Sequence, residues 1–454
     1  MTGSSADDLL TALDPEQSVA ARALLGPVCI LAGAGTGKTR AITHRIAYGV
    51  ATGVYSPNRV MALTFTSRAA AELRSRLRPL GAGGVAARTF HAAALSQLNY
   101  FWPQVVGGEA PKIIDNKAKA IAHAAELVKL RVDTATLRDV AAEIEWRKVS
   151  NLSIEEYALA ARSSRTLPSN LGLEQMLELQ QRYEALKDER RQLDFEDVLL
   201  ATAGMIELEP SVAIQVREQY RFFVVDEFQD VSPLQHHLLE LWLGTRRDLC
   251  VVGDASQTIY SFAGASADYL LGFERRHPSA TVVSLERNYR STEPIVAAAN
   301  RLMRGRAGAL TLHAASRQRH AEESREASAA SAGPAPSATE PPEPVVTAYR
   351  DDLAEAAGVA ARVAELVAEG VAPHDIAVLY RVNSQSAPLE QALTEAGVSY
   401  QLRGGTRFFD QPDVKRAVME LRAASVSITE EPLFKSVSDV LRSRGWTQHE
   451  PEGV

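Results

Sequence analysis

The hydrophobic residues of the chain gather in short apolar runs, which alternate with stretches whose apolar positions recur every three or four residues. Runs with strand character occupy residues 28–32, 60–65, 85–90, 222–225, 249–253 and 281–285. Strands that alternate with helical segments in this way are typical of a parallel sheet with helices on both faces. The pattern therefore predicts an α/β fold with a doubly wound parallel sheet.

A long segment without strand character separates the third apolar run from the fourth. Residues 96–195 read as mostly helical, and their apolar spacing predicts helices over 134–148 and 173–187. Further along, an amphipathic pattern predicts a helix over 353–369, followed by a strand over 376–380. We therefore expect a helical insertion in the first α/β domain and a second α/β unit after residue 345.

The stretch 314–344 separates the two units and contains no Val, Ile, Leu, Met or aromatic residue. Ala, Ser, Glu and Pro dominate it. Such a composition buries too little apolar surface to offset the entropy lost on ordering. We predict a disordered surface insertion.

Composition narrows the class of protein. The length of 454 residues allows about three domains. A net charge of −7 means that a polyanion would have to be bound in a local groove. Two cysteines are too few for a disulfide framework or a zinc site. With no secretory pattern and no 18-residue apolar run, we expect a cytoplasmic protein without a membrane partner.

A glycine-rich segment between the first apolar run and a helical stretch at 40–47 has the order strand, loop, helix of a phosphate-binding P-loop. Its backbone N–H groups can turn towards phosphate at a helix N-terminus, with a lysine as a point charge and a threonine hydroxyl for Mg²⁺. A plain turn is the alternative, and the first glycine of the strict pattern is replaced by alanine. The predicted nucleotide-binding residues here are Ala32, Gly33, Ala34, Gly35, Thr36, Gly37, Lys38 and Thr39.

An acidic pair follows the apolar run 222–225. Asp226 at the end of a buried strand is placed to hold Mg²⁺ together with Thr39, and Glu227 to polarise a water. A solvated acidic turn is the alternative, and the P-loop upstream favours the catalytic interpretation.

Seven motifs together resemble the UvrD/Rep family of superfamily 1 DNA helicases over about residues 13–420. Four are GAGTGKT (33–39), VDEFQD (225–230), GDASQTIYSFAGA (253–265) and ERNYRST (286–292). The other three are LDPEQ (13–17), LTFTSRAAAEL (63–73) and TFHAAAL (89–95), in the family's order.

The resemblance implies an ATP- and Mg²⁺-dependent RecA-like P-loop NTPase core. By this likeness Lys38 pairs with phosphate oxygens, Gln257 senses the γ-phosphate, and Arg290 reaches it from the second domain. The amide of Gln17 recognises adenine, and Tyr289 and Arg40 lie on the two faces of the base.

The resemblance also implies binding of single-stranded DNA through aromatic side chains and backbone-tracking polar groups. The implied stacking residues are Phe65, Tyr260 and Phe262, and the implied phosphate or sugar contacts are Thr66, Arg68, Thr89 and His91. Phe262 and Ala263 stand where the family usually has Trp-Arg, so we expect a weaker grip there.

The family's organisation implies a first RecA-like domain at 1–95 and 196–281 with a helical insertion at 96–195. A partial second RecA-like domain would occupy 282–313 and 345–425, including the family-like segment 404–409, and a further region would begin at 426–454. The family's later motifs have no counterpart before Val454. We therefore expect an incomplete second motor domain.

The leading functional hypothesis is an ATP-driven helicase that moves 3′ to 5′ on single-stranded DNA and acts at junctions with duplex, in repair or replication. The alternative is an ATP-gated DNA-binding fragment that does not unwind. A helicase–nuclease subunit would need a nuclease domain, and a P-loop kinase is disfavoured by the order of the motifs.

Overall fold

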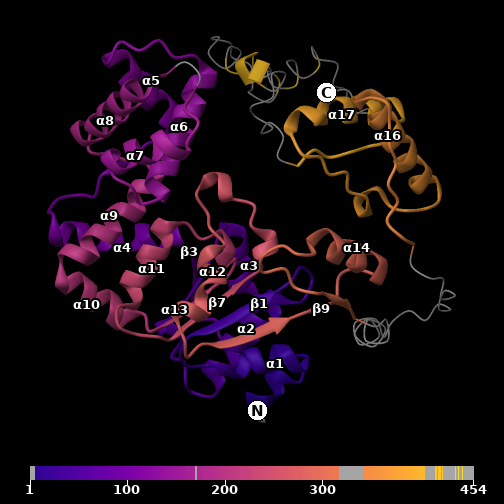
Figure 1. Ribbon diagram of the computed structural model, residues 1–454, viewed down its shortest axis with the longest axis horizontal. Helices are drawn as coiled ribbons and strands as arrows, with labels where there is room; N and C mark the ends of the chain where they lie inside the picture. The colour runs from indigo at the N-terminus through magenta and orange to yellow at the C-terminus, as the bar shows by residue number, and fades with distance from the viewer. Residues whose placement is uncertain are drawn as a thin grey trace. The chain divides into compact units, whose positions relative to one another are not determined.

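The computed structural model describes residues 6–168, 171–315 and 342–403, with residues 415, 416, 418–420, 422, 435, 438 and 442 beyond them. The chain divides into two compact units, Met1–Pro344 and Val345–Val454, which are described separately (Figure 1).

The first unit is built on a six-stranded sheet whose neighbouring strands are all parallel. The strand order is β3-β2-β6-β7-β1-β8. Four strands match the predicted ranges: β1 (Val28–Ala32), β6 (Phe222–Val225), β7 (Leu249–Gly253) and β8 (Thr281–Leu285). The other two, β2 (Val60–Thr64) and β3 (Ala86–Thr89), are slightly shorter than predicted. The predicted α/β class with a parallel sheet is confirmed.

Helices cover both faces of this sheet, so its central strands are buried throughout (Figure 1). One face packs on α1 (Pro15–Arg22), α2 (Lys38–Ala51) and α3 (Ser67–Leu77). The other face packs on α4 (Phe90–Val105), α9 (Phe195–Leu208), α10 (Pro210–Gln219) and α11 (Pro233–Leu243). Short helices α12 (Asp268–Leu271) and α13 (Phe273–Arg276) precede β8.

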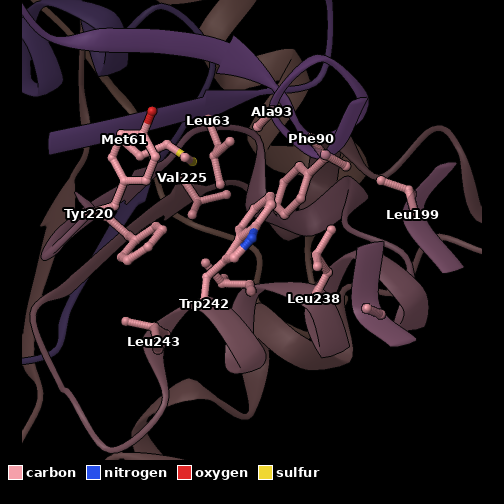
Figure 2. Close-up of a cluster of buried hydrophobic side chains, with 14 of the residues drawn as sticks. Met61, Leu63, Phe90, Ala93, Leu199, Tyr220, Val225, Leu238, Trp242 and Leu243 are labelled. Carbon is pink, nitrogen blue, oxygen red and sulfur yellow. The ribbon is translucent and has the colours of Figure 1, made fainter. Parts of the chain in front are cut away.

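Alternation along the strands divides the core into two layers. Met61 and Leu63 of β2 face the α4 side, whereas Val60 and Ala62 face the α2 side. On the α4 side the fully buried Trp242 packs between aromatic rings (Figure 2), with centroids 5.9 Å from Phe90 and 6.3 Å from Phe223. The two cysteines, Cys29 and Cys250, are buried thiols in β1 and β7, as predicted.

The predicted helical insertion is present. It comprises α5 (Lys117–Leu127), α6 (Thr134–Val149), α7 (Ile154–Ser164) and α8 (Leu173–Glu189) around a core of its own. Two short parallel strands, β4 (Lys112–Ile113) and β5 (Gln192–Leu193), pair where the chain enters and leaves it. This pairing holds the two ends of the insertion together.

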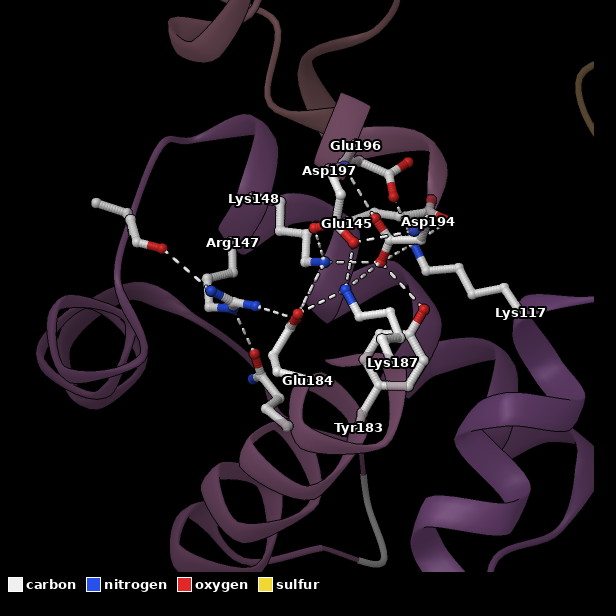
Figure 3. A network of polar contacts seen from close by, with 12 residues as sticks. Lys117, Glu145, Arg147, Lys148, Tyr183, Glu184, Lys187, Asp194, Glu196 and Asp197 are labelled. Atoms are coloured by element: carbon white, nitrogen blue, oxygen red, sulfur yellow. Dashed lines mark hydrogen bonds and ion pairs between the residues drawn. The ribbon is translucent and has the colours of Figure 1, made fainter. Parts of the chain in front are cut away.

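A buried network of charges joins the insertion to α9 (Figure 3). Lys148 Nζ lies 2.7 Å from Asp194 Oδ2 and 2.6 Å from Asp197 Oδ1, and Lys187 contacts the same two carboxylates. Burial opposes the charge on Lys148, but Asp194 and Asp197 raise its pKa above the ordinary value. The ammonium is therefore held charged inside the protein.

The segment after β8 stays with the first unit. It contains β9 (Arg287–Asn288), α14 (Glu293–Met303) and β10 (His313–Ala314), and β9 pairs in parallel with β10. The predicted boundary at 281/282 falls within β8, and the full set of domain boundaries stays a prediction. Ala314 lies in β10, so it is ordered, contrary to the prediction for 314–344, and residues 316–341 of that segment lie outside the described residues.

The second unit contains α16 (Asp352–Ala368), which confirms the predicted amphipathic helix, and α17 (Ser386–Glu395). They share a small core of Ala360, Val363 and Leu393. The strand predicted at 376–380 is wrong for the described structure. Ile376 and Val378 pack on this core while Leu379 is exposed, but no described backbone forms a ladder with them.

The segment 404–409 and most of 426–454 lie outside the described residues. Within the described part of the chain, none of the helices has the length and apolar character needed to cross a membrane.

Candidate functional site

The loop between β1 and α2 has the conformation that its glycines predict. Gly35 and Gly37 have φ of +73° and +80°, and Gly37 is the N-cap residue directly before α2. A Cβ at Gly37 would lie 2.7 Å from Gln17 Nε2, and one at Gly35 would lie 2.8 Å from Arg290 Cβ. Both positions therefore need glycine. Since Gly37 has no side chain to cap α2, the first N–H groups of the helix are open to an anion.

A cavity of about 540 Å³ opens beside this loop. Residues from widely separated parts of the first unit meet there, and all but one were predicted from the sequence. The predicted lining residues are Gln17, Gly33, Ala34, Gly35, Gly37, Lys38, Thr39, Arg40, Glu227, Gln257, Tyr289 and Arg290, and the additional one is Arg76.

Two predicted residues of the loop do not line the cavity. Ala32 is buried at the end of β1, and Thr36 is buried beneath the loop. The Thr36 hydroxyl donates to Gly33 O over 2.8 Å, and its carbonyl accepts from Gln17 Nε2 over 2.9 Å. These two residues shape the loop from behind.

The acidic pair lies at the end of β6. Glu227 Oε2 lies 3.0 Å from Lys38 Nζ and accepts from Gln229 Nε2 over 2.8 Å. Glu227 also has φ of +53°, a left-handed conformation that costs free energy in a residue other than glycine. The strained backbone turns its carboxylate into the cavity beside Lys38.

Asp226 sits deeper than Glu227 and does not line the cavity. Burial, with the neighbouring Glu227 charge, raises the pKa of Asp226 to about 7, and Lys38 opposes this shift. A carboxylate in such a place gains from a nearby cation, and together with the Thr39 hydroxyl it offers the hard oxygen donors that Mg²⁺ prefers. No cluster of three or more His, Cys, Asp or Glu that could hold a metal occurs among the described residues. These donors thus fit a cation whose coordination shell would be completed by nucleotide phosphate and water.

Hydrogen bonds connect Glu227 to Gln257. Gln229, which is buried, donates to Glu227 and accepts from Asp254 N over 3.1 Å. Asp254 Oδ2 in turn accepts from Gln257 Nε2 over 2.8 Å. The ends of β6 and β7 are therefore linked through a chain of side-chain hydrogen bonds.

The segment after β8 is fastened to the P-loop. Asn288 Nδ2 donates to Ala34 O over 2.7 Å, and Tyr289 N donates to Gly35 O over 2.8 Å. Asn288 Oδ1 accepts from the backbone N–H of Arg290 over 2.9 Å. Arg290 thus lines the cavity from within the first compact unit, and its assignment to a second RecA-like domain stays a prediction.

Three predicted aromatic residues come together near the ends of β2 and β7. The rings of Phe65 and Tyr260 stack with centroids 4.3 Å apart, and Tyr260 lies 6.2 Å from Phe262. Phe262 is 76% exposed and Phe65 38% exposed. Exposed, stacked rings of this kind can receive the faces of nucleic-acid bases.

The residues predicted to contact phosphate or sugar differ in their surroundings. Thr66 Oγ1 and Thr89 Oγ1 each cap a helix, accepting over 3.1 Å from Ala69 N and Ala92 N respectively. Arg68 is exposed on α3. The two hydroxyls therefore have a structural role whatever else they contact.

His91, which was also predicted to contact phosphate or sugar, stacks on Phe195, with ring centroids 4.0 Å apart and planes at 11°. Its Nε2 is buried without a hydrogen-bond partner among the described residues, and burial lowers its pKa to about 4. A neutral imidazole brings no charge to a phosphate. Phe195 is 53% exposed and supplies a second aromatic surface.

Comparison with known proteins follows this geometry. Residues 13–278 match the family model of the UvrD/REP helicase N-terminal domain, and residues 283–432 match that of the UvrD-like helicase C-terminal domain. The first match alone covers more than half of the chain. The chain belongs to the UvrD/Rep helicase family.

Relatives in this family differ in their similarity to the chain. It is 47% identical over 464 residues to the ATP-dependent DNA helicase UvrD2 of Mycobacterium tuberculosis, covering 99% of this chain and 63% of the relative. It is 30% identical over 433 residues to the helicase PcrA of Bacillus subtilis, covering 92% and 54%. Against UvrD1 of M. tuberculosis it is 31% identical over 446 residues, covering 92% and 53%. The chain therefore spans between about half and two thirds of the length of these relatives.

The family resemblance inferred from the motifs is thereby confirmed. Sequence reasoning missed Arg76, which lies beyond the motif at 63–73, and Asp254, whose side chain was read only as part of a motif. It also missed Phe195 as a surface ring. The one available signal was that Phe195 lies between acidic residues at the start of a helix, where a side chain is open to solvent.

Proposed function

We propose that this chain is an ATP-dependent DNA helicase that translocates 3′ to 5′ along single-stranded DNA and opens duplexes at junctions, in DNA repair or replication. The relatives are named ATP-dependent DNA helicases, which supports ATP as the nucleotide and DNA as the substrate. The proposal includes a cytoplasmic location.

One observation carries the proposal: the predicted nucleotide-binding side chains and the exposed aromatic rings lie at the same edge of one sheet. Phe65 follows β2, Glu227 follows β6 and Tyr260 follows β7, and these three strands are neighbours in the sheet. Asp230 Oδ1, in the acidic segment, also accepts from Ile259 N over 3.2 Å, next to Tyr260. A change at the phosphates can therefore reach the rings through a short chain of hydrogen bonds.

In the proposed reaction the protein positions the γ-phosphate and a water. Lys38 and the N–H groups of the loop bind the phosphates. Thr39 and Asp226 would hold Mg²⁺, which would supply charge neutralisation. Glu227 accepts the proton of the attacking water. Gln257 and Arg290, which both line the cavity, contact the γ-phosphate as its charge changes.

The base and the DNA have separate places in the proposal. Gln17, Tyr289 and Arg40 bind adenine on the side of the cavity nearest α1. Single-stranded DNA stacks on Phe65, Tyr260 and Phe262, with Thr66, Arg68, Thr89 and His91 along its backbone. The neutral state of His91 supports a hydrogen-bonding or stacking role for this residue.

The alternative of an ATP-gated fragment that does not unwind is not favoured, because models for both helicase domains match the chain. The test compares forked duplexes with a 3′ or a 5′ single-stranded tail, incubated with Mg·ATP. We expect strand separation of the 3′-tailed fork only. DNA-stimulated ATP hydrolysis without any separation would support the alternative, and the absence of nucleotide binding would contradict both.

A further inference from the structure

Asp14 is a buried carboxylate with a separate partner for each of its oxygens. It precedes α1, and it is 6% exposed. Its Oδ1 accepts from Gln17 N over 2.7 Å, and its Oδ2 accepts from the Tyr289 hydroxyl over 2.7 Å. Capping α1 needs one oxygen only. The second oxygen serves a residue 275 positions away.

The bond to Asp14 completes the restraint on Tyr289. The backbone N–H of Tyr289 is fixed to Gly35 O over 2.8 Å, and its hydroxyl is fixed to Asp14. With both ends held, the ring between them has little freedom to turn. Tyr289 and Gln17 line the same cavity.

Gln17 is restrained by the same residue. The backbone N–H of Asp14 donates to Gln17 Oε1 over 3.3 Å, which completes a capping box, and Gln17 Nε2 donates to Thr36 O over 2.9 Å. The amide is therefore oriented with its nitrogen under the P-loop. Asp14 thus contacts the side chains of Gln17 and Tyr289, two of the three residues proposed to bind the base.

We propose that Asp14 is a positioning residue for base recognition, which holds Gln17 and Tyr289 in their binding arrangement before nucleotide arrives. This inference rests on the proposed function, since it assumes that a nucleotide occupies the cavity. Pre-organised side chains lose less conformational entropy when a ligand binds, so their alignment adds to affinity. Aspartate suits the task because its carboxylate offers two acceptors, whereas serine offers an acceptor for the cap but is too short to reach Tyr289.

The experiment separates this role from a structural one. D14S keeps a cap for α1 and breaks the bond to Tyr289. Y289F breaks the same bond, together with the hydroxyl's hydrogen bond to Arg287, while keeping the ring. Binding of Mg·ATP, Mg·GTP and Mg·tripolyphosphate is measured by calorimetry for the parent chain, both variants and the double variant. The matched control is D133S, which makes the same change at Asp133, the cap of α6, whose Oδ1 accepts from Thr136 N over 2.7 Å.

We expect D14S and Y289F each to weaken ATP binding about tenfold, because a side chain that is no longer held in place must be ordered when the nucleotide binds. The preference for ATP over GTP falls together with the ATP affinity, whereas the affinity for tripolyphosphate stays within about twofold of the parent value. D133S leaves the binding of all three ligands unchanged. The double variant binds ATP no more weakly than Y289F alone, because Y289F already removes the bond that D14S breaks.

Unchanged ATP affinity in D14S and Y289F would overturn the inference, as would additive losses in the double variant. Equal losses for ATP and tripolyphosphate would also overturn it, because they would indicate general damage to the P-loop. A parent chain that binds neither ligand would instead contradict the proposed function itself. Y289F keeps the cap of α1 intact, so it tests the bond even where D14S fails to fold.

Discussion

At the scale of single residues, the contact of Lys38 with Glu227 brings together the charge proposed to bind phosphate and the carboxylate proposed to activate water. The ammonium lies in a cavity and is not part of the apolar core. We predict that Lys38→Ala weakens ATP binding about 100-fold or more, because it removes a charge-assisted contact, while the fold is kept. A fluorescent ATP analogue measures this, with Lys119→Ala on the exposed face of α5 as the control. ATP affinity equal to that of the parent would contradict the P-loop assignment.

Glu227 is predicted to act in the chemical step and not in binding. Glu227→Gln keeps the size of the side chain and an acceptor for Lys38 and Gln229, but it cannot take a proton. ATP binding should therefore persist while hydrolysis falls at least about 100-fold, the contribution of a general base. Phosphate release under saturating ATP measures the effect. Turnover like that of the parent would mean that water is activated by another group.

His91 gives stability a pH dependence of known sign. Burial lowers the pKa of His91 to about 4, below its ordinary value near 6.5. Between these values His91 binds a proton in the unfolded chain but not in the folded protein. The contribution of His91 to the free energy of unfolding is therefore complete above pH 6.5 and is lost as the pH drops towards 4.

Replacing His91 should remove this dependence. We predict that His91→Gln loses less stability than the parent between pH 7 and pH 4, by about 2–3 kcal/mol. Urea unfolding at both pH values measures the difference, with His123→Gln at an exposed histidine as the control. Parallel pH profiles for the parent and His91→Gln would show that His91 titrates normally.

At the scale of elements, the buried charges around Lys148 join α6 and α8 to the start of α9 (Figure 3). Removing Lys148 leaves the buried carboxylates of Asp194 and Asp197 to Lys187, with one cation fewer in a medium of low polarity. We predict that Lys148→Met lowers the free energy of unfolding by about 3–5 kcal/mol. Arg182→Met is the control, because its pair with Glu189 lies at the surface and is worth about 1 kcal/mol or less. Equal effects of the two variants in urea unfolding would contradict the network's role.

At the scale of the whole molecule, the net charge of −7 means that DNA binding must depend on local contacts. Phe262, which is 76% exposed, offers stacking without charge, whereas Arg68 offers charge. We predict that Phe262→Ala weakens single-stranded DNA binding by about 5- to 10-fold at every salt concentration. Arg68→Ala should instead reduce the slope of log affinity against log salt by roughly 0.7. Fluorescence anisotropy with a labelled oligonucleotide separates the two, and identical salt slopes for all three proteins would contradict a phosphate contact by Arg68.

Much of the fold and of the candidate nucleotide site was determined by the sequence alone. Strands of a parallel sheet are buried on both faces, so they appear as continuous apolar runs, and four of the six were located to the residue. The chemistry of phosphate binding also demands particular residues in a fixed local order, which is why Gly37, Lys38 and Glu227 could be placed before any coordinates.

Only the tertiary structure decided how distant residues combine. Nothing local in Asp14 indicates that it meets Tyr289, and Lys148 reads as a solvated helix residue until α9 brings its carboxylates to it. The stack of His91 on Phe195 likewise depends on how α4 and α9 pack. Residues 376–380 form an apolar run with strand character, yet a strand needs a neighbouring backbone to pair with, and the fold decides whether one is present. Local chemistry can be predicted from short sequence patterns. Contacts between distant residues depend on the distances and angles between helices and strands, which are set only by packing.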